Sequence, residues 1–181
     1  MKRAFLALPI PDDIAEALVP LQAGIPGARW QSRDNMHITL NFLGNVEETD
    51  LEILDEILQD IDFQTFPVTV RGVGSFETGK HKEPKILWAG IEKTEALLQL
   101  KKKTDQVVKS AGCDVERRRF TPHITLARMN KAPLNKVAGF IEAHNLLELP
   151  SFTADKFSLY ESHLSEKGSI YMPLVDYPLQ K

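Results

Sequence analysis

Cysteine is almost absent from this sequence of 181 residues. Cys113 is the only one, so no disulfide can form within the chain, and we expect a reducing, cytoplasmic setting. No apolar run approaches the ~20 residues of a membrane span, and we expect no membrane partner. The apolar residues 4–8 are followed by Asp12 and Asp13 with no small-residue cleavage site, which is unlike a signal peptide. Positive charge is not in excess, since the formal net charge is −3, and this argues against a broad electrostatic grip on duplex nucleic acid.

Several signatures of catalysis are missing as well. The sequence has no Gly-rich phosphate loop, no dinucleotide-binding fingerprint and no serine nucleophile elbow, and we expect no cofactor. The paired carboxylates Asp12-Asp13 and Glu47-Glu48 fall at expected helix starts, where such residues are typical of caps.

The pattern of apolar residues indicates mixed secondary structure. Alternating or apolar runs predict strands over residues 3–8, 36–43, 66–76, 86–91, 119–128, 152–161 and 169–175. Helical spacing predicts a helix capped by Asp12, a second over residues 50–60, a third from its cap at Thr94 to residue 111, and a fourth over residues 135–143. Hairpins outnumber parallel crossovers, so we predict an α+β fold with antiparallel sheets and helices on their outer faces.

One tetrapeptide occurs twice, as His37-Ile38-Thr39-Leu40 and as His123-Ile124-Thr125-Leu126. From the composition, about 0.002 copies are expected by chance, so coincidence is a poor explanation. The two copies lie nearly half the chain apart, which suggests a single domain over residues 1–181 made of two related lobes.

The repeated motif predicts a catalytic face. On a strand, alternate side chains share a face, so each histidine lies beside the threonine two residues later, about 6.5 Å away. If the lobes meet, two histidines and two threonines line one cleft. One imidazole can accept a proton while the other donates one, and hydroxyls can hold phosphate oxygens, which suits displacement at a phosphodiester.

The motif residues and the basic clusters also have structural interpretations. A single His-x-Thr motif is more often a satisfied polar pair at a sheet edge, but two matching copies argue against that. Two histidines are too few ligands for a catalytic metal, and neither motif has a carboxylate or cysteine at ligand spacing, so we expect no metal. Lysines 101–103 are typical of a solvated helix face. Arginines 117–119 are either an exposed lead-in to the strand or a local grip on a few nucleotides.

The sequence resembles the two-histidine (2H) phosphoesterases of the LigT-like group, the RNA 2′,3′-cyclic phosphodiesterases also called 2′-5′ RNA ligases. Besides both histidine motifs and Trp30, the resemblance rests on residues 3–8, 35–44, 86–90, 120–128, 161–164 and 168–171. It implies a bilobal, pseudo-two-fold fold with the active cleft between the lobes. It also implies that His37 is the proton donor to the departing ribose 3′-oxygen and that His123 is the proton acceptor that activates water.

The resemblance implies further roles. Thr39 and Thr125 would hold the phosphate oxygens, and the product would carry a 2′-phosphate. With an RNA 5′-hydroxyl in place of water, the reverse reaction would form a 2′-5′ linkage. Phe42 and Arg128 would sandwich the terminal base, although an odd offset from each histidine predicts the opposite face of an undistorted strand. The family often has arginine where His163 stands, which puts a phosphate contact from that position in doubt.

Two other functions remain open from the sequence. One is a related phosphoesterase that acts on small cyclic nucleotides or 2′-5′-linked oligonucleotides, and the other is a non-catalytic module that binds RNA ends. The expected partners are RNA ends or nucleotides with a 2′,3′-cyclic phosphate. We expect no obligate protein partner and a monomer.

Overall fold

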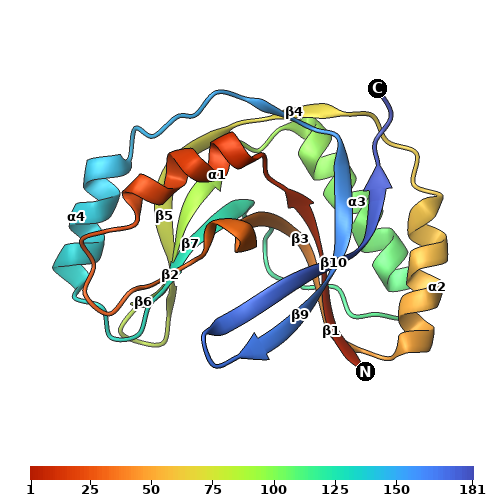
Figure 1. Cartoon of the computed structure of the whole chain (residues 1–181), viewed down its shortest axis with the longest axis horizontal. Helices are drawn as coiled ribbons and strands as arrows, with labels where there is room; N and C mark the ends of the chain where they lie inside the picture. Colours follow the sequence, from red (N-terminus) through yellow and green to blue (C-terminus); the bar gives the residue numbers. More distant parts are fainter.

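The computed structural model describes all 181 residues (Figure 1). Its strands are β1 (Lys2–Pro9), β2 (Arg29–Trp30), β3 (His37–Val46), β4 (Phe66–Val68), β5 (Val70–Thr78), β6 (Glu83–Ile91), β7 (His123–Arg128), β8 (Phe152–Ala154), β9 (Lys156–Ser165) and β10 (Gly168–Pro178). Its helices are α1 (Asp12–Leu18), α2 (Glu48–Gln59), α3 (Glu95–Ser110) and α4 (Leu134–His144), with short 3-10 turns at Val19–Leu21 and Arg33–Asn35. The α+β class is confirmed.

The main sheet has the order β10-β9-β1-β3-β7-β6-β5, with β2 added beside β7 and every neighbouring pair antiparallel. It consists of two halves, β10-β9-β1-β3 and β2-β7-β6-β5. The halves join through a single residue pair, Ile38 with Ile124. The sequence predicted one sheet in each lobe. In the structure the two are joined into one continuous sheet that narrows to this single residue pair between its halves. Helices α2 and α3 pack on the first half and α4 packs on the second (Figure 1).

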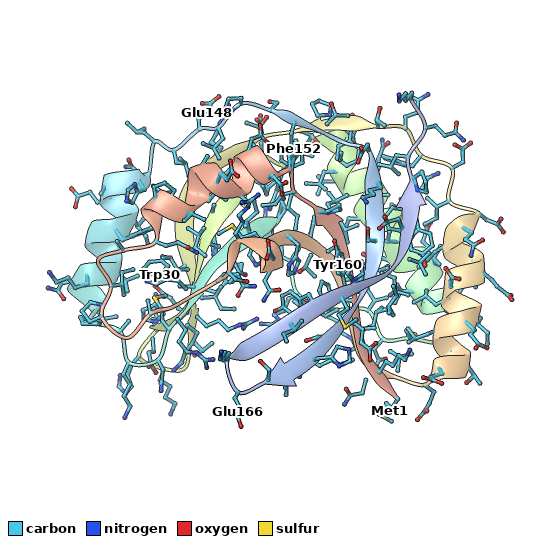
Figure 2. All side chains as sticks on the ribbon, in the orientation of Figure 1. Met1, Trp30, Glu148, Phe152, Tyr160 and Glu166 are labelled. Atoms are coloured by element: carbon cyan, nitrogen blue, oxygen red, sulfur yellow. The ribbon has the colours of Figure 1, made fainter.

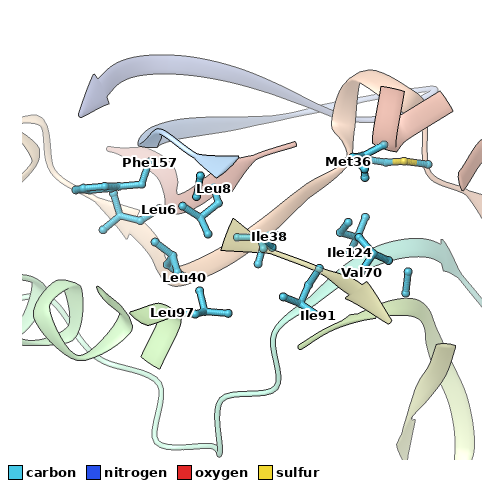
Figure 3. Close-up of a cluster of buried hydrophobic side chains, with 14 of the residues drawn as sticks. Leu6, Leu8, Met36, Ile38, Leu40, Val70, Ile91, Leu97, Ile124 and Phe157 are labelled. Atoms are coloured by element: carbon cyan, nitrogen blue, oxygen red, sulfur yellow. The ribbon is translucent and has the colours of Figure 1, made fainter. Parts of the chain in front are cut away.

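The residue pair that joins the two halves is buried in the core. Ile38 and Ile124 are fully buried and lie near each other among leucines of neighbouring elements (Figure 3). Burying a side chain of this size stabilises a fold by about 1.5–3 kcal/mol. Because Ile38 and Ile124 alternate with the motif histidines and threonines along each strand, this packing fixes which face those polar side chains occupy.

Several predicted boundaries were wrong. The predicted strand 66–76 is broken at Thr69, whose hydroxyl bonds Ser151, because β4 leaves the main sheet to pair with β8 while β5 returns along β6. The predicted strand 152–161 is broken at Asp155 for the same reason. The strand predicted over 119–128 begins only at His123, after Pro122, whose carbonyl accepts from Ile91 outside a strand ladder.

The predicted helix caps had mixed outcomes. Thr94 caps α3 as predicted, because its Oγ1 accepts a hydrogen bond from the backbone N–H of Leu97 at 3.3 Å. Asp12 is not a cap; it is the first residue of α1, which Pro11 precedes without a side-chain hydrogen bond. Its carboxylate still lies in the first turn, where negative charge favours the helix dipole. The Glu47 side chain likewise makes no capping bond at α2.

Candidate active site

His37 begins β3 and is held at both ring nitrogens. Its Nδ1 lies 2.7 Å from the carbonyl oxygen of Asn35, and its Nε2 lies 2.9 Å from Thr39 Oγ1. Three aromatic rings surround it, with Phe5 at 4.9 Å, Tyr171 at 5.1 Å and edge-on, and Tyr160 at 6.3 Å between ring centroids. Tyr160 lies near the middle of the molecule in Figure 2.

His123 begins β7 and has the same anchor. Its Nδ1 lies 2.7 Å from the carbonyl oxygen of Thr121, again two residues upstream. Phe76 meets the imidazole edge-on at 4.8 Å, and Trp88 lies at 6.3 Å. The Trp88 indole lies across Gly74 so closely that a Cβ at that position would collide with its ring. This glycine therefore makes the room that lets Trp88 lie beside His123.

These anchors fix the tautomer of both rings. A carbonyl oxygen only accepts, so Nδ1 of each histidine carries the hydrogen. In the neutral ring the proton-accepting nitrogen is then Nε2. Thr39 Oγ1 donates to Nε2 of His37, whereas Nε2 of His123 has no hydrogen-bond partner in the protein.

Both rings favour the neutral form. Burial lowers the pKa of His37 from 6.5 to about 4, against the Asn35 carbonyl bond, which raises it; the charges of His123 and Arg128 lower it further. Burial is also the main cause that lowers the pKa of His123, and the Arg128 charge adds to it, while the Thr121 carbonyl and Glu116 oppose it. Arg128 therefore acts on both imidazoles, and the two histidines resist being charged together.

The narrow junction between β3 and β7 brings the two motifs side by side on one face of the sheet. Antiparallel pairing of Ile38 with Ile124, continued by one residue, sets His37 toward Thr125 and His123 toward Thr39. Strands β3 and β7 pair only at Ile38 and Ile124, so they diverge on either side of these residues. The structure thus brings together all four residues that the repeated motif predicted.

Each motif strand also carries a bulge at the same place. In β3, Thr39 pairs with Ala7 and Asn41 with Leu6, which leaves Leu40 unpaired. In β7, Thr125 pairs with Trp88 and Ala127 with Leu87, which leaves Leu126 unpaired. A bulge adds one residue and reverses the alternation of side chains beyond it. Two consecutive residues of each strand are accordingly buried, at 40–41 and at 126–127.

The bulges bring Phe42 and Arg128 to the histidine face. Phe42 is 55% exposed, and its ring lies 6.3 Å from Phe5, which itself contacts His37. Arg128 is exposed and lies near enough to both histidines to lower their pKa values. Simple alternation predicted that Phe42 and Arg128 lie on the opposite face. This prediction was wrong, because a bulge distorts each strand before these residues.

Asn41 ties the β3 bulge to α3. Its Nδ2 donates to Asp105 Oδ1 at 2.5 Å, and the same carboxylate pairs with Lys101. The Lys101 ammonium also lies 5.4 Å over the ring of Phe120. Lys101 is only 13% exposed, so its assignment to a solvated helix face was wrong, whereas Lys102 and Lys103 are exposed.

The sequence did not identify the aromatic residues that surround the histidines: Phe5, Phe76, Trp88, Tyr160 and Tyr171. Most of them lie in segments that carry the family resemblance, and that was the only signal available. His163 lies off the site, because Tyr171 pairs with Ser162 and so shares its face, which leaves the neighbouring His163 on the other. There its Nε2 is 3.5 Å from Glu161.

No group of three or more His, Cys, Asp or Glu side chains is arranged to hold a metal ion. No helix is long and apolar enough to cross a bilayer.

A duplicated strand motif, two imidazoles with matching tautomers and a basic side chain near both define a two-histidine phosphoesterase. The profile of the family described as LigT like Phosphoesterase matches residues 8–88 and 90–171. The chain belongs to this family, and the resemblance seen in the sequence is confirmed.

Related proteins are similar to this chain over nearly its whole length. A Thermotoga maritima protein named RNA 2′,3′-cyclic phosphodiesterase is 31% identical over 182 residues, which cover 96% of this chain and 94% of that protein. A Bacillus subtilis protein of the same name is 32% identical and covers 90% of this chain and 88% of its own length. The crystal structure of E. coli LigT complexed with 3′-AMP superposes with a TM-score of 0.82 at 26% identity, covering 99% of both chains.

Proposed function

We propose that this enzyme hydrolyses 2′,3′-cyclic phosphates at RNA ends to 2′-phosphates. The observation that carries the proposal is the pair of imidazoles, His37 and His123. Each has Nδ1 held by a carbonyl, which leaves Nε2 as the nitrogen that exchanges protons; Nε2 of His37 is bonded to Thr39, and Nε2 of His123 is free. The proteins from T. maritima and B. subtilis that share about a third of its residues bear the name of this activity.

Each side chain then has one task. His123 Nε2 accepts a proton from water as the water oxygen bonds to phosphorus. The bond from phosphorus to the 3′-oxygen breaks, and that oxygen takes a proton from Nε2 of His37. Thr39 and Thr125 donate hydrogen bonds to the non-bridging oxygens, where negative charge is held. No metal or cofactor takes part.

His37 must gain its proton in the substrate complex. In the free enzyme its pKa is about 4, so the ring is neutral near pH 7. A phosphodiester anion beside the ring favours the charged form and raises the pKa. Binding of the anionic substrate therefore favours the protonated form of His37, which donates its proton to the departing 3′-oxygen.

Phe42 and Arg128 are proposed to hold the terminal base between a ring and a guanidinium plane. Both are exposed, and the two bulges turn them toward the histidine face. Every base offers a π-face, so such a clamp tolerates all four bases. An RNA 5′-hydroxyl that attacks phosphorus in place of water would displace the same 3′-oxygen and form a 2′-5′ linkage.

The test is a substrate panel with wild type beside His37→Ala. Wild type should hydrolyse both a 2′,3′-cyclic mononucleotide and a short oligoribonucleotide with a cyclic end, and phosphorus NMR should show a 2′-phosphate. Turnover of 2′-5′-linked oligonucleotides alone would favour the related small-substrate enzyme. Binding of cyclic-ended RNA without turnover would favour a binding module, and a 3′-phosphate product would reverse the roles of the histidines.

We also infer that the enzyme works as a monomer in the cytoplasm. The single cysteine, Cys113, supports a reducing compartment, and every residue of the proposed mechanism comes from one chain. Sedimentation of the purified protein at working concentration tests the monomer, and fractionation of the source cells tests the location. A dimer or a membrane-bound pool would contradict it.

A further inference from the structure

Arginines 117–119 stand out in a protein of net charge −3, and the proposed chemistry does not use them. All three are exposed, in the irregular segment between α3 and β7. Arg118 Nε pairs with Glu116 Oε1 at 2.7 Å, while Arg117 and Arg119 have no carboxylate within ion-pair distance. Two uncompensated cations therefore lie next to one internally neutralised pair.

This segment is fixed at its end beside His123. Lys101 lies over the Phe120 ring, the Thr121 carbonyl holds the imidazole, and the Pro122 carbonyl accepts from Ile91. Arg119 immediately precedes these anchors, and four residues of chain reach at most about 14 Å. At the other end of the arginine run, Glu116 pairs with Arg118, and its charge opposes the lowering of the His123 pKa. The arginines thus form a rim next to the base of the proposed reaction.

A cyclic end is the 3′ terminus of an RNA strand, so any further nucleotides must leave the site past one of its rims. Their phosphates need positive charge, because the protein as a whole is acidic. We propose that Arg117 and Arg119 bind the backbone phosphates that precede the cyclic end, and so favour oligonucleotides over mononucleotides. This inference rests on the proposed function and adds the substrate class.

Glu116 limits this rim. Its carboxylate pairs with the Arg118 guanidinium as a phosphate oxygen would, so Arg118 can bind a phosphate only when this ion pair opens. With Glu116 in place, the rim offers two phosphate contacts. Removing that carboxylate should add a third.

The experiment compares the double variant Arg117→Ala/Arg119→Ala with a double variant, Lys102→Ala/Lys109→Ala, on the exposed face of α3. The control removes the same charge from a neighbouring part of the chain. Each is assayed for kcat/KM on a 2′,3′-cyclic mononucleotide and on a short oligoribonucleotide with the same cyclic end, from low to high salt. Circular dichroism and Tm verify that both variants are folded.

The arginine variant should lose roughly 2- to 30-fold in kcat/KM on the oligonucleotide at low salt, as expected for two exposed charge pairs. The salt dependence on that substrate should fall by about 1.4 in log–log slope, for two phosphates on a single strand. The mononucleotide rate and the lysine control should not change. In Glu116→Gln, the ratio of oligonucleotide to mononucleotide rate should rise, and this ratio cancels any effect on His123.

Equal losses on both substrates, no loss on either, or the same loss in the lysine control would overturn the inference while leaving the proposed function intact. A wild-type enzyme that hydrolyses neither substrate would overturn both. Retained mononucleotide turnover thus separates a failure of this inference from a failure of the proposed chemistry.

Discussion

The low pKa of His37 leads to a quantitative prediction about anion binding. With a pKa of about 4, only about 1 in 300 free molecules carries a proton on this ring at pH 6.5. The difference from an ordinary histidine corresponds to about 3 kcal/mol. An anion that restores the usual pKa must therefore bind the protonated enzyme about 300-fold more tightly than the neutral enzyme.

Sulfate is a suitable probe, because its charge is constant over this pH range. Its Kd for wild type should tighten by up to tenfold for each pH unit from 6.5 down toward 4. Calorimetry gives the Kd, and NMR of the ring protons gives the pKa with and without sulfate. His37→Ala should keep only the weaker pH dependence that arises from His123. A free His37 that titrates near 6.5, or a Kd independent of pH, would refute this electrostatic account.

The same pKa difference affects stability, with a defined sign. The folded pKa of His37 is below the unfolded value, so the unfolded chain binds more protons between pH 6.5 and 4. Stability is therefore lost as pH falls through this window. At pH 4.5 the loss from His37 amounts to about 2.5 kcal/mol, measured as the difference in acid sensitivity between wild type and His37→Ala in urea unfolding. Equal acid sensitivity of the two proteins would contradict the shift.

The other predictions concern the histidine pair, the clamp, the indole and metals. His37→Ala or His123→Ala should each lower kcat by ~10²–10⁴-fold, and the double variant should lose far less than the product, as steady-state kinetics can show. Phe42→Ala should raise KM for cyclic-ended RNA by roughly 5- to 150-fold with little preference among bases; an unchanged KM would assign Phe42 to packing. Gly74→Ala should destabilise the fold by about 1–3 kcal/mol in urea unfolding, because its Cβ meets Trp88, whereas Gly139→Ala in α4 meets open space and should be neutral or stabilising. Activity should survive exhaustive chelation, and a loss restored by a divalent ion would contradict metal independence.

The sequence predicted the fold class and the histidine–threonine face because both depend on local periodicity. Ile38 and Ile124 alternate with polar residues, and that alternation survives in the structure up to the bulge. Gly44 and Asn130 suggest that each motif strand is ending, where twist or a bulge can re-aim a side chain. The positions of the bulges could not be predicted, because the unpaired Leu40 and Leu126 look like any other buried strand residue. Their positions depend on which residue of a neighbouring strand pairs with which.

The aromatic residues around His37 could not be predicted from the sequence either. Phe5, Tyr160 and Tyr171 come from three different strands, and the order β10-β9-β1-β3 brings them to His37. Local pattern gives no information on such a strand order. The same holds for Lys101, whose burial depends on Asn41 and Asp105 meeting across two elements.

The repeated motif gives the two lobes the same backbone frame but different chemistry. Both imidazoles are anchored through Nδ1, yet burial among aromatic rings depresses the pKa of His37 strongly, while Glu116 partly supports the charged form of His123. The proposed reaction needs a proton on His37 and an unprotonated His123, whereas burial favours the neutral form of both rings in the free enzyme. A phosphate anion beside His37 favours the charged form of that ring, so the charge of the substrate is part of the switch that activates the site.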